Sequence, residues 1–583
     1  MKVKSYILAI LSALVPMTVY CYGNGTSEDL AYVETDRNVY LAGEKLWIAV
    51  LCLNRNNDRN NDRNNPKCNE WTIGSNSSIA YVEMHSADGM VLTERIALAK
   101  GRGAGSFTLP ANLPTGNYVL TAYTKCGANA PEQFNKTISI YNSFTCDRVA
   151  DGVEVSDERP AGPVSGNFVQ CGAGKGYEAD FLNAGSGRFK VRIRNNSGKD
   201  GVVNISLVAN DALASLAMEN RSLADALKAV ELSPVDENKQ IESVKRELEY
   251  EGEIIEARVV GKDASRVCSG DFCACISVPG ERSDAYCSYI AADGLVRFYT
   301  NNIYGTKDMA LQILEADSSW DCHLELISPF RNVQVRIPEK LVLYPSLQET
   351  LLERSVGSQI VKQFHTDALQ ELMHVRINPL LGERSISYRL DDYTRFHNME
   401  ELFVEFIAEL RTRKGQIQVR TEDSYEDPTF EHGASLVMLD GVPVFDHSKI
   451  LAYDPLNVES VEIYPYNYFF GKYEFCGIVN FVTYKRNMPG FKFNSNVRIE
   501  EFKGASYPVA YTCKNLFDDN AAGGAGASGS QRASDTGYPD YRSTLYWNPC
   551  VSIPAGGSFE FEGPIPEYCT KRNVPLLVRV NGL

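Results

Sequence analysis

The cysteines are the residues of this sequence that first suggest chemistry, either as metal ligands or as disulfides. The 583-residue chain has 15 cysteines and 7 histidines. The cysteines occur singly except for Cys273 and Cys275, and the sequence contains neither a C-x-x-C pair nor an H-E-x-x-H motif. Zinc sites require such spacings. We therefore expect structural disulfides or buried free thiols, and no metal site.

Two pairs of cysteines are candidates for disulfide bonds. Cys52 and Cys68 flank an asparagine-rich loop, and a predicted hairpin brings Cys275 near Cys287. Disulfides are typical of exported proteins, and an even number of cysteines remains once Cys21 of the N-terminal segment is set aside. The sequence leaves the connectivity open.

Motifs of the common hydrolases are absent from the sequence. No G-x-S-x-G elbow occurs, no cysteine and histidine share a recognisable protease setting, and no pair stands out among the 74 acidic residues. The segment 54–65 alternates Asp and Asn as a calcium loop does, but Arg63 and Asn69 stand where that loop needs Gly and Glu. We predict a protein that is not an enzyme and has no cofactor, with an envelope hydrolase as the less favoured alternative.

Charge and the N-terminal segment bear on partners and location. A formal net charge of -16 argues against a nucleic-acid partner, because phosphate binding needs clustered Lys and Arg. Residues 1–23 combine two lysines, an apolar run and small residues near Gly23, which is the pattern of a secretory signal peptide. A lipid anchor at Cys21 is the alternative. No later segment could cross a bilayer as a helix. We expect an exported protein of the periplasm, outer membrane or cell surface.

Alternation of apolar and polar residues predicts a mainly β, multidomain fold. In the second unit, for example, Phe189, Val191 and Ile193 alternate with basic residues ahead of a Gly-Lys-Asp-Gly turn. The predicted units are a signal peptide (1–23), a β-sandwich (28–146), a second β-sandwich with a helical insertion (165–250), a third β-sandwich (251–335), a helical linker (336–384), an α+β unit (385–487) and a C-terminal β-sandwich with a glycine-rich loop at 520–537 (488–583).

A helix is predicted between Asn398 and Gly415. Asn398 and Glu401 are similar to a capping box, and three basic residues before Gly415 suit the other end. Apolar residues between them recur at spacings of three and four. They are Met399, Leu402, Phe403, Phe406, Ile407 and Leu410.

Turn residues separate the short apolar strands that follow this helix. Asp440 and Gly441 are typical of a hairpin turn, and Pro443 suits a strand at the edge of a sheet. Gly471 is a further turn position, and Gly477 allows close packing of the backbone. We assign all of these residues structural roles, because none is poised for chemistry.

The order of these motifs resembles the plug domain of TonB-dependent receptors. The resemblance extends over 385–485 and comprises the strand and turn at 436–444, the stretch 455–463, Gly471 and the strand 477–483. Its implication is an α+β unit of the plug type. Only 98 residues follow Lys485, whereas a receptor barrel of about 22 strands at roughly ten residues each needs well over 200. We therefore expect no transporter.

The flanking units resemble other modules of the bacterial envelope. Residues 40–44 and 113–124 are similar to the macroglobulin MG2 module, and the turn at Asp293 and Gly294 is similar to the carboxypeptidase regulatory-like fold. The stretch 541–549, "YRSTLYWNP", resembles the terminal sandwich of a Gram-negative family that joins macroglobulin-like modules to an orphan plug. The macroglobulin thioester signature G-C-G-E-Q is absent, which excludes covalent trapping of proteases.

The resemblance implies a binding protein or scaffold that docks through its sandwiches and its plug-like unit. The expected partner is an envelope protein, such as a component of an outer-membrane complex. A surface adhesin or assembly subunit that binds a glycan or protein is the alternative.

Overall fold

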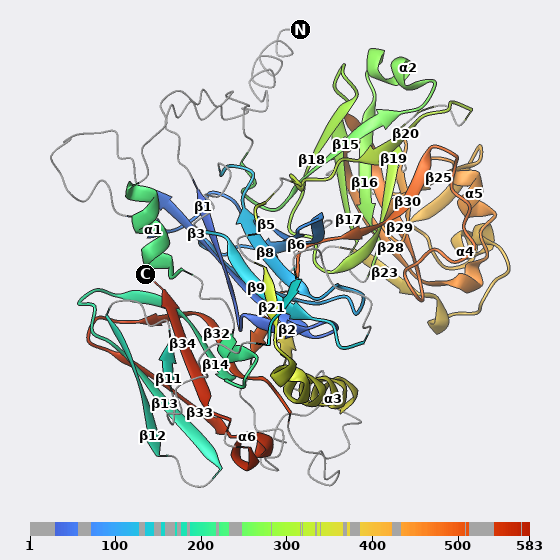
Figure 1. The fold of residues 1–583 in the computed structure, drawn as a ribbon. Helices are drawn as coiled ribbons and strands as arrows, with labels where there is room; N and C mark the ends of the chain where they lie inside the picture. Colours follow the sequence, from blue (N-terminus) through green and yellow to red (C-terminus); the bar gives the residue numbers. More distant parts are fainter. Residues whose placement is uncertain are drawn as a thin grey trace.

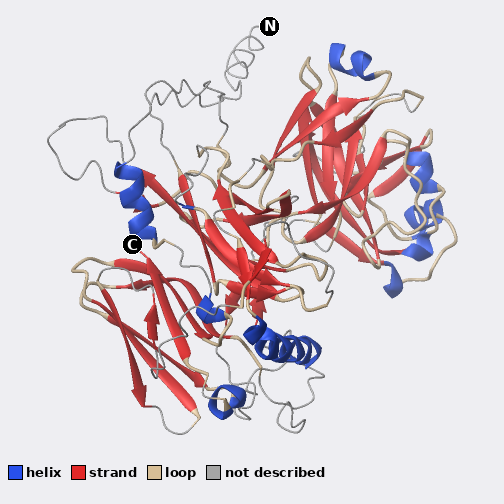
Figure 2. Cartoon of the chain, viewed as in Figure 1, coloured by secondary structure: helices blue, strands red, loops and turns tan. Residues whose placement is uncertain are grey.

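The computed structural model describes residues 29–55, 71–127, 134–144, 153–157, 169–171, 176–183, 187–216, 221–232, 248–280, 283–314, 316, 319–332, 335–337, 340–364, 370–372, 385–421, 433–507, 509–511, 541–572 and 574–582. The predicted signal segment, Cys21, Cys68 and the glycine-rich loop lie outside these residues. The described chain is mainly β and forms several sheets (Figure 2). Its helices are few and short, and none of those described is long and apolar enough to cross a membrane.

The N-terminal sandwich lies at the centre of the molecule (Figure 1). One sheet comprises β1 (Leu30–Thr35), β3 (Lys45–Arg55), β4 (Trp71–Ile73) and β7 (Arg102–Thr108). The other comprises β2 (Val39–Leu41), β9 (Lys136–Tyr141), β8 (Gly116–Tyr123), β5 (Ile79–Ser86) and β6 (Gly89–Ala97). Val33, Tyr118 and Leu120 alternate into the core between the two sheets.

A second sandwich, here called the composite sandwich, is built from two distant parts of the chain. One sheet comprises β11 (Val169–Cys171), β34 (Leu576–Gly582), β14 (Gly201–Ala209) and β32 (Thr544–Ile553). The other comprises β12 (Tyr177–Asn183), β13 (Arg188–Asn195) and β33 (Ser558–Pro564).

This architecture corrects the expectation of separate sandwiches at 165–250 and 488–583. Strand β34 pairs with β14 from Val203↔Gly582 to Ala209↔Leu576, and β33 pairs with β13 over its length. Apolar residues of both segments share one core. Neither segment alone has enough strands to form two sheets that cover each other's apolar faces. The strands of the two segments therefore combine into one sandwich.

The third sandwich also recruits a later strand. One sheet comprises β18 (Leu295–Tyr299), β15 (Ile254–Val260) and β20 (His323–Leu326). The other comprises β17 (Asp284–Tyr289), β16 (Cys273–Val278), β19 (Thr306–Ile313) and β30 (Val497–Lys503). Helix α2 (Ala264–Ser269) packs beside β15. Strand β30 lies beyond the predicted boundary of 251–335 and pairs with β19.

The predicted plug-like unit is α+β. Its sheet has the order β23 (Ile386–Arg389), β28 (Val458–Phe470), β29 (Tyr473–Thr483), β26 (Leu436–Leu439) and β27 (Val442–Pro443). The hairpin β24 (Leu410–Arg413) and β25 (Gln416–Val419), with α4 (Met399–Glu405) and α5 (His447–Leu451), covers one face.

The helix predicted from Asn398 to Gly415 is wrong at its C-terminal end. Asn398 is the N-cap, and its side chain accepts a hydrogen bond from the Glu401 amide. The helix ends at Glu405, and residues 410–419 form a hairpin instead. Lys414 and Gly415 have φ values of 52° and 75°, which suit a tight hairpin turn. The apolar spacing gave the wrong helix end because Leu410 reaches the same core from strand β24.

Short elements connect the units. They are β10 (Val153–Val155), η3 (Ala214–Leu216), α1 (Leu223–Leu232), β21 (Leu341–Leu343), η4 (Pro345–Leu347), α3 (Gln348–Phe364), β22 (Gln370–Leu372), η5 (Leu390–Asp392), η6 (Pro455–Asn457), β31 (Val509–Tyr511) and α6 (Glu567–Lys571). Helix α3 occupies part of the expected linker 336–384, and α1 packs on the N-terminal sandwich through Leu223 and Leu227.

Candidate functional site

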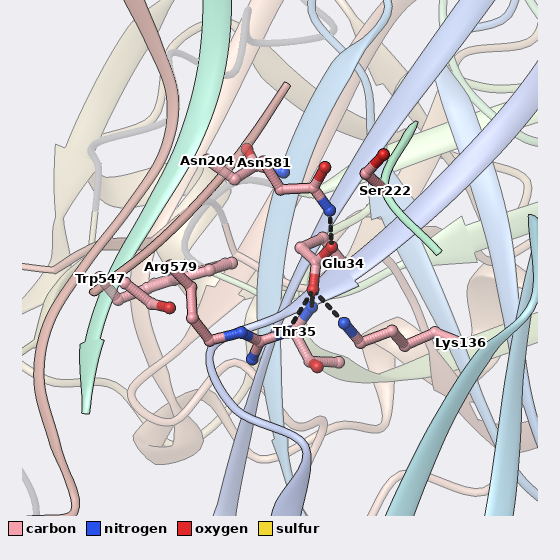
Figure 3. A pocket seen from close by; sticks show the side chains of 9 residues that line it. Glu34, Thr35, Lys136, Asn204, Ser222, Trp547, Arg579 and Asn581 are labelled. Atoms are coloured by element: carbon pink, nitrogen blue, oxygen red, sulfur yellow. Dashed lines mark hydrogen bonds and ion pairs between the residues drawn. The ribbon is translucent and has the colours of Figure 1, made fainter. Parts of the chain in front are cut away.

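A small polar cavity lies between the N-terminal sandwich and the composite sandwich (Figure 3). Its volume is about 50 Å³. Since a buried water needs roughly 10–15 Å³ by this measure, the cavity has room for a few waters or one small polar group. The lining residues are Glu34, Thr35, Lys136, Asn204, Ser206, Ser222, Trp547, Arg579 and Asn581.

Strand alternation directs these side chains into the gap between the two sandwiches. On β1, Ala31 and Val33 face the core of the N-terminal sandwich, so Glu34 points outward. On β34, Val578 and Val580 face the composite core, so Arg579 and Asn581 point away from it. The two outward faces meet, and their polar groups are buried against each other.

The Glu34 carboxylate is the centre of the cavity. Lys136 donates to its Oε1, and Arg579 Nη2 lies 3.4 Å from the same oxygen. Asn581 Nδ2 donates to Oε2 at 2.5 Å, and the Tyr32 hydroxyl donates to Oε2 at 2.8 Å. Figure 3 shows lysine, arginine and asparagine converging on this one carboxylate.

Burial and charge set the protonation of this group. The side chains of Lys136 and Glu34 are 2% and 4% exposed. Burial alone would raise the pKa of Glu34, but the charges of Lys136 and Arg579 outweigh it and lower that pKa to about 2. Burial lowers the pKa of Lys136 to about 8, although Glu34 acts in the opposite direction. Glu34 is therefore an anion at neutral pH, and Lys136 is easier to deprotonate than an exposed lysine.

A second set of hydrogen bonds holds the Asn581 carboxamide. Its Nδ2 also donates to the Tyr32 hydroxyl at 2.7 Å, and its Oδ1 accepts from the Leu223 amide at 3.2 Å. Leu223 is the first residue of α1, whose N-terminal amides have no partner within the helix. On the opposite wall, Asn204 Nδ2 is buried and has no hydrogen-bond partner among the described residues.

Sequence reasoning did not single out Glu34, Lys136, Arg579 or Asn581. Each occupies the polar half of an ordinary alternating strand, and the four come from β1, β9 and β34. Because distant segments meet only in the folded chain, no local spacing signals this cluster.

The turn residues chosen from the sequence lie in the plug-like unit, far from this cavity in the fold. Asp440 and Gly441 have φ values of 51° and 81° and connect β26 to β27. Asp440 also accepts hydrogen bonds from the amides of Thr483 and Met488, at 2.6 and 2.9 Å. This residue therefore anchors the end of β29 in addition to forming a turn.

The other three predicted positions have packing roles. Pro443 ends β27, which is an edge strand. Gly471 lies in the β28–β29 turn, and a Cβ there would be 2.5 Å from Cys287 Sγ. Gly477 has a φ of 80°, and a Cβ there would be 2.5 Å from Val419 Cγ1. At both glycines the neighbouring chain approaches too closely for a side chain.

Of the four predicted disulfide residues, Cys52, Cys275 and Cys287 carry free thiols in the structure. Cys275 and Cys287 are directly opposite each other on β16 and β17, as the hairpin prediction requires, but are not bonded. Burial raises the pKa of Cys275 to about 12, so its thiol is neutral. Cys52 is a buried free thiol in the N-terminal sandwich, and its proposed partner Cys68 lies outside the described residues. Within the described ranges, no group of three or more His, Cys, Asp or Glu side chains could hold a metal ion.

Comparisons with known proteins add little beyond the fold itself. No protein-family model matches the chain, and no curated protein matches it. Trypsin-activated alpha-2-macroglobulin from Escherichia coli is 11% identical, with 52% of this chain and 16% of that chain covered and a TM-score of 0.15. The CARDB domain of a Pyrococcus furiosus protein is 11% identical, with 20% and 93% covered and a TM-score of 0.13. Salmonella alpha-2-macroglobulin reacted with methylamine is 10% identical, with 92% and 27% covered and a TM-score of 0.15.

This chain therefore spans well under two thirds of the length of the macroglobulins to which it is similar. The strand pairing of the chain itself identifies it as a mainly β, multidomain protein of β-sandwiches with one α+β unit.

Proposed function

We propose that this protein is a non-enzymatic scaffold of the bacterial cell envelope that docks to an envelope protein through its plug-like α+β unit. The observation that carries this proposal is a patch of exposed apolar residues on that unit. It consists of Leu456 and Tyr484, which both contact Arg395, and Tyr393, which precedes Arg395 by two residues. Leu456, Tyr484 and Tyr393 are 48%, 43% and 43% exposed. Single exposed apolar residues are normal, but a group of them around one cation is typical of a contact surface.

Arg395 organises the patch. Its Nη2 donates to the carbonyl oxygens of Pro455 and Val458, at 3.3 and 3.0 Å, and lies 3.3 Å from the Tyr484 hydroxyl. Tyr393 is held by stacking on Phe406, with ring centroids 4.3 Å apart. The patch is thus pre-ordered, which lowers the entropic cost of binding.

The other units support a scaffold role because they are joined through buried contacts. The N-terminal sandwich meets the third sandwich through Arg95 and Glu253, with Nε and Oε2 2.7 Å apart. The third sandwich meets the plug-like unit through a buried apolar cluster, and an exposed ion pair between Lys472 and Asp271, 2.9 Å apart, lies at the same junction. A chain fastened in this way presents its plug-like unit in a defined orientation.

Site-specific photo-crosslinking in the native envelope tests the proposal. A photoreactive amino acid at Leu456 should capture one envelope protein, whereas the same group at Val155, which is 73% exposed on the distant strand β10, should not. Identical adducts from both positions, or none from Leu456, would count against docking through this patch.

A glycan-binding adhesin is the second candidate, favoured by exposed tyrosines on the third sandwich. Tyr289 and Tyr299 are 58% and 64% exposed, and exposed aromatic rings with a polar tip suit sugar contacts. Binding of the purified chain to a glycan panel, lost on Tyr299→Ala, would support this alternative.

A further inference from the structure

The cavity between the two sandwiches brings together the three groups that form an amide cross-link. They are an amine (Lys136), a carboxamide (Asn581) and a carboxylate between them (Glu34). Lys136 Nζ donates a hydrogen bond to Oε1 of Glu34, and Asn581 Nδ2 donates one to Oε2 of the same carboxylate. Figure 3 shows Lys136 and Asn581 approaching Glu34 from two sides. The arrangement is therefore a nucleophile, an electrophile and a proton carrier in one buried cluster.

We propose that Lys136 and Asn581 react to form an isopeptide bond that joins the N-terminal sandwich covalently to the composite sandwich. This inference goes beyond the scaffold function and does not depend on it. Lys136 Nζ attacks Cγ of Asn581, a new Cγ–Nζ bond forms, and the Cγ–Nδ2 bond breaks. A lysine ammonium and a carboxamide become a secondary amide and an ammonium ion, so atoms and charge balance without oxidant or reductant.

The surroundings of each group suit its part in this reaction. Burial lowers the pKa of Lys136 to about 8, so roughly a tenth of the amine is neutral at pH 7. Glu34 contacts both nitrogens and can pass a proton from the attacking amine to the leaving one. The Leu223 amide, 3.2 Å from Asn581 Oδ1, is placed to stabilise negative charge on that oxygen in the tetrahedral intermediate.

Charge in the cluster favours the product. Before reaction, Lys136 and Arg579 share the single carboxylate of Glu34, and Asp36 further along the chain is paired with Arg37. Excess buried charge is costly. The reaction expels one positive charge as ammonium and leaves Glu34 balanced by Arg579. The adjoining cavity of about 50 Å³ gives the leaving ammonia a place to go.

A bond between residues 136 and 581 would tie two sandwiches that are otherwise held by noncovalent contacts, including the ion pair between Glu34 and Arg579. Like a disulfide, it restricts the unfolded chain, and the effect is large because the closed loop is long. Unlike a disulfide, it resists reduction. The cross-link would join β9 to β34, the last described strand.

Mass spectrometry of the purified full chain tests the proposal directly. We expect the folded protein to be lighter by one ammonia than its Lys136→Arg variant, after correction for the substitution. Protease digestion should yield one branched peptide containing Lys136 and Asn581. An uncross-linked Asn581, whether intact or deamidated, in folded protein kept at neutral pH for days would overturn the proposal. The branched peptide is sought in the unchanged protein, so this readout does not depend on any variant folding.

Variants then test the assigned roles. Asn581→Ala should abolish the branched peptide, and Glu34→Gln should slow its formation on the order of 100-fold, the usual contribution of a positioned proton carrier. Lys125→Arg is the matched control, because Lys125 also pairs with a buried glutamate, Glu249, at 3.2 Å but is not part of this cluster. The control should cross-link fully. Equal rates in Glu34→Gln and the unchanged chain would refute the role of Glu34.

Discussion

The turn at Gly441 offers a sharp test of how the plug-like unit sits on the third sandwich. Gly441 has a φ of +81°, and a Cβ built there would lie 2.1 Å from Cβ and 2.4 Å from Oγ of Ser283. Gly415 is a matched position in the same unit, because it has a φ of +75° in a similar hairpin turn but nothing within 4 Å of its Cβ. Substituting alanine at each therefore separates backbone strain from the steric clash.

The expected losses of stability follow from the backbone strain and the steric clash. Forcing alanine into the left-handed region costs about 1–2 kcal/mol, which is the whole effect expected for Gly415→Ala. Gly441→Ala should add about 1–3 kcal/mol, because Ser283 and its neighbours must move to admit the new methyl group. The total for Gly441→Ala is then about 2–5 kcal/mol.

Native-state hydrogen exchange of the full chain is the suitable assay, because a multidomain protein does not unfold in one two-state step. Peptides from β26 and β27 report the opening free energy of the unit around the turn. Combining Gly441→Ala with Ser283→Gly should reduce the loss to that of Gly415→Ala. If Gly441→Ala and Gly415→Ala lose the same stability, the contact with Ser283 does not exist and the docking described above is incorrect.

Three further predictions follow from the buried groups. His447 Nδ1 accepts a hydrogen bond from the Ile417 amide, and burial lowers the pKa of His447 from 6.5 to about 4. As the pH falls, the unfolded chain therefore binds a proton at this histidine at a higher pH than the folded chain does. The plug-like unit should lose stability as pH falls from 6.5 towards 4, and His447→Gln should flatten this dependence in urea unfolding. Arg95→Met should weaken the contact between the N-terminal and third sandwiches by about 3–5 kcal/mol, because it leaves Glu253 buried without its partner. Adding Glu253→Leu should recover much of this lost stability, as measured by hydrogen exchange. Cys275, with its raised pKa and full burial, should escape alkylation at about pH 8 until the protein is unfolded in urea, and rapid labelling of the native chain would contradict its placement.

Local chemistry in the sequence was sufficient for several elements. Asp440 followed by Gly441 predicts a hairpin turn because few residues tolerate positive φ, and both have it. Asn398 predicts a helix start because its side chain replaces a missing backbone partner, and it does so for Glu401. The helix end was missed because Leu410 fits a helical spacing and a strand equally well.

The class of the protein follows from its amino-acid sequence. Alternation with period two makes sandwiches, and short turn motifs end their strands, because these are interactions between residues close along the chain. Tertiary structure alone decided which strands share a sandwich. Strands β30, β33 and β34 complete sheets whose other strands lie hundreds of residues earlier in the chain. An uncovered apolar face can pair with any strand that has the matching alternation of apolar residues and the matching register.

The candidate site belongs to the same category. Glu34, Lys136 and Asn581 each look like ordinary outward-facing polar residues. The shifted pKa values of Glu34 and Lys136 arise only when two sandwiches meet and exclude water. Burial strengthens the interaction of Glu34 with Lys136 and Arg579, because charges interact strongly only where solvent no longer screens them.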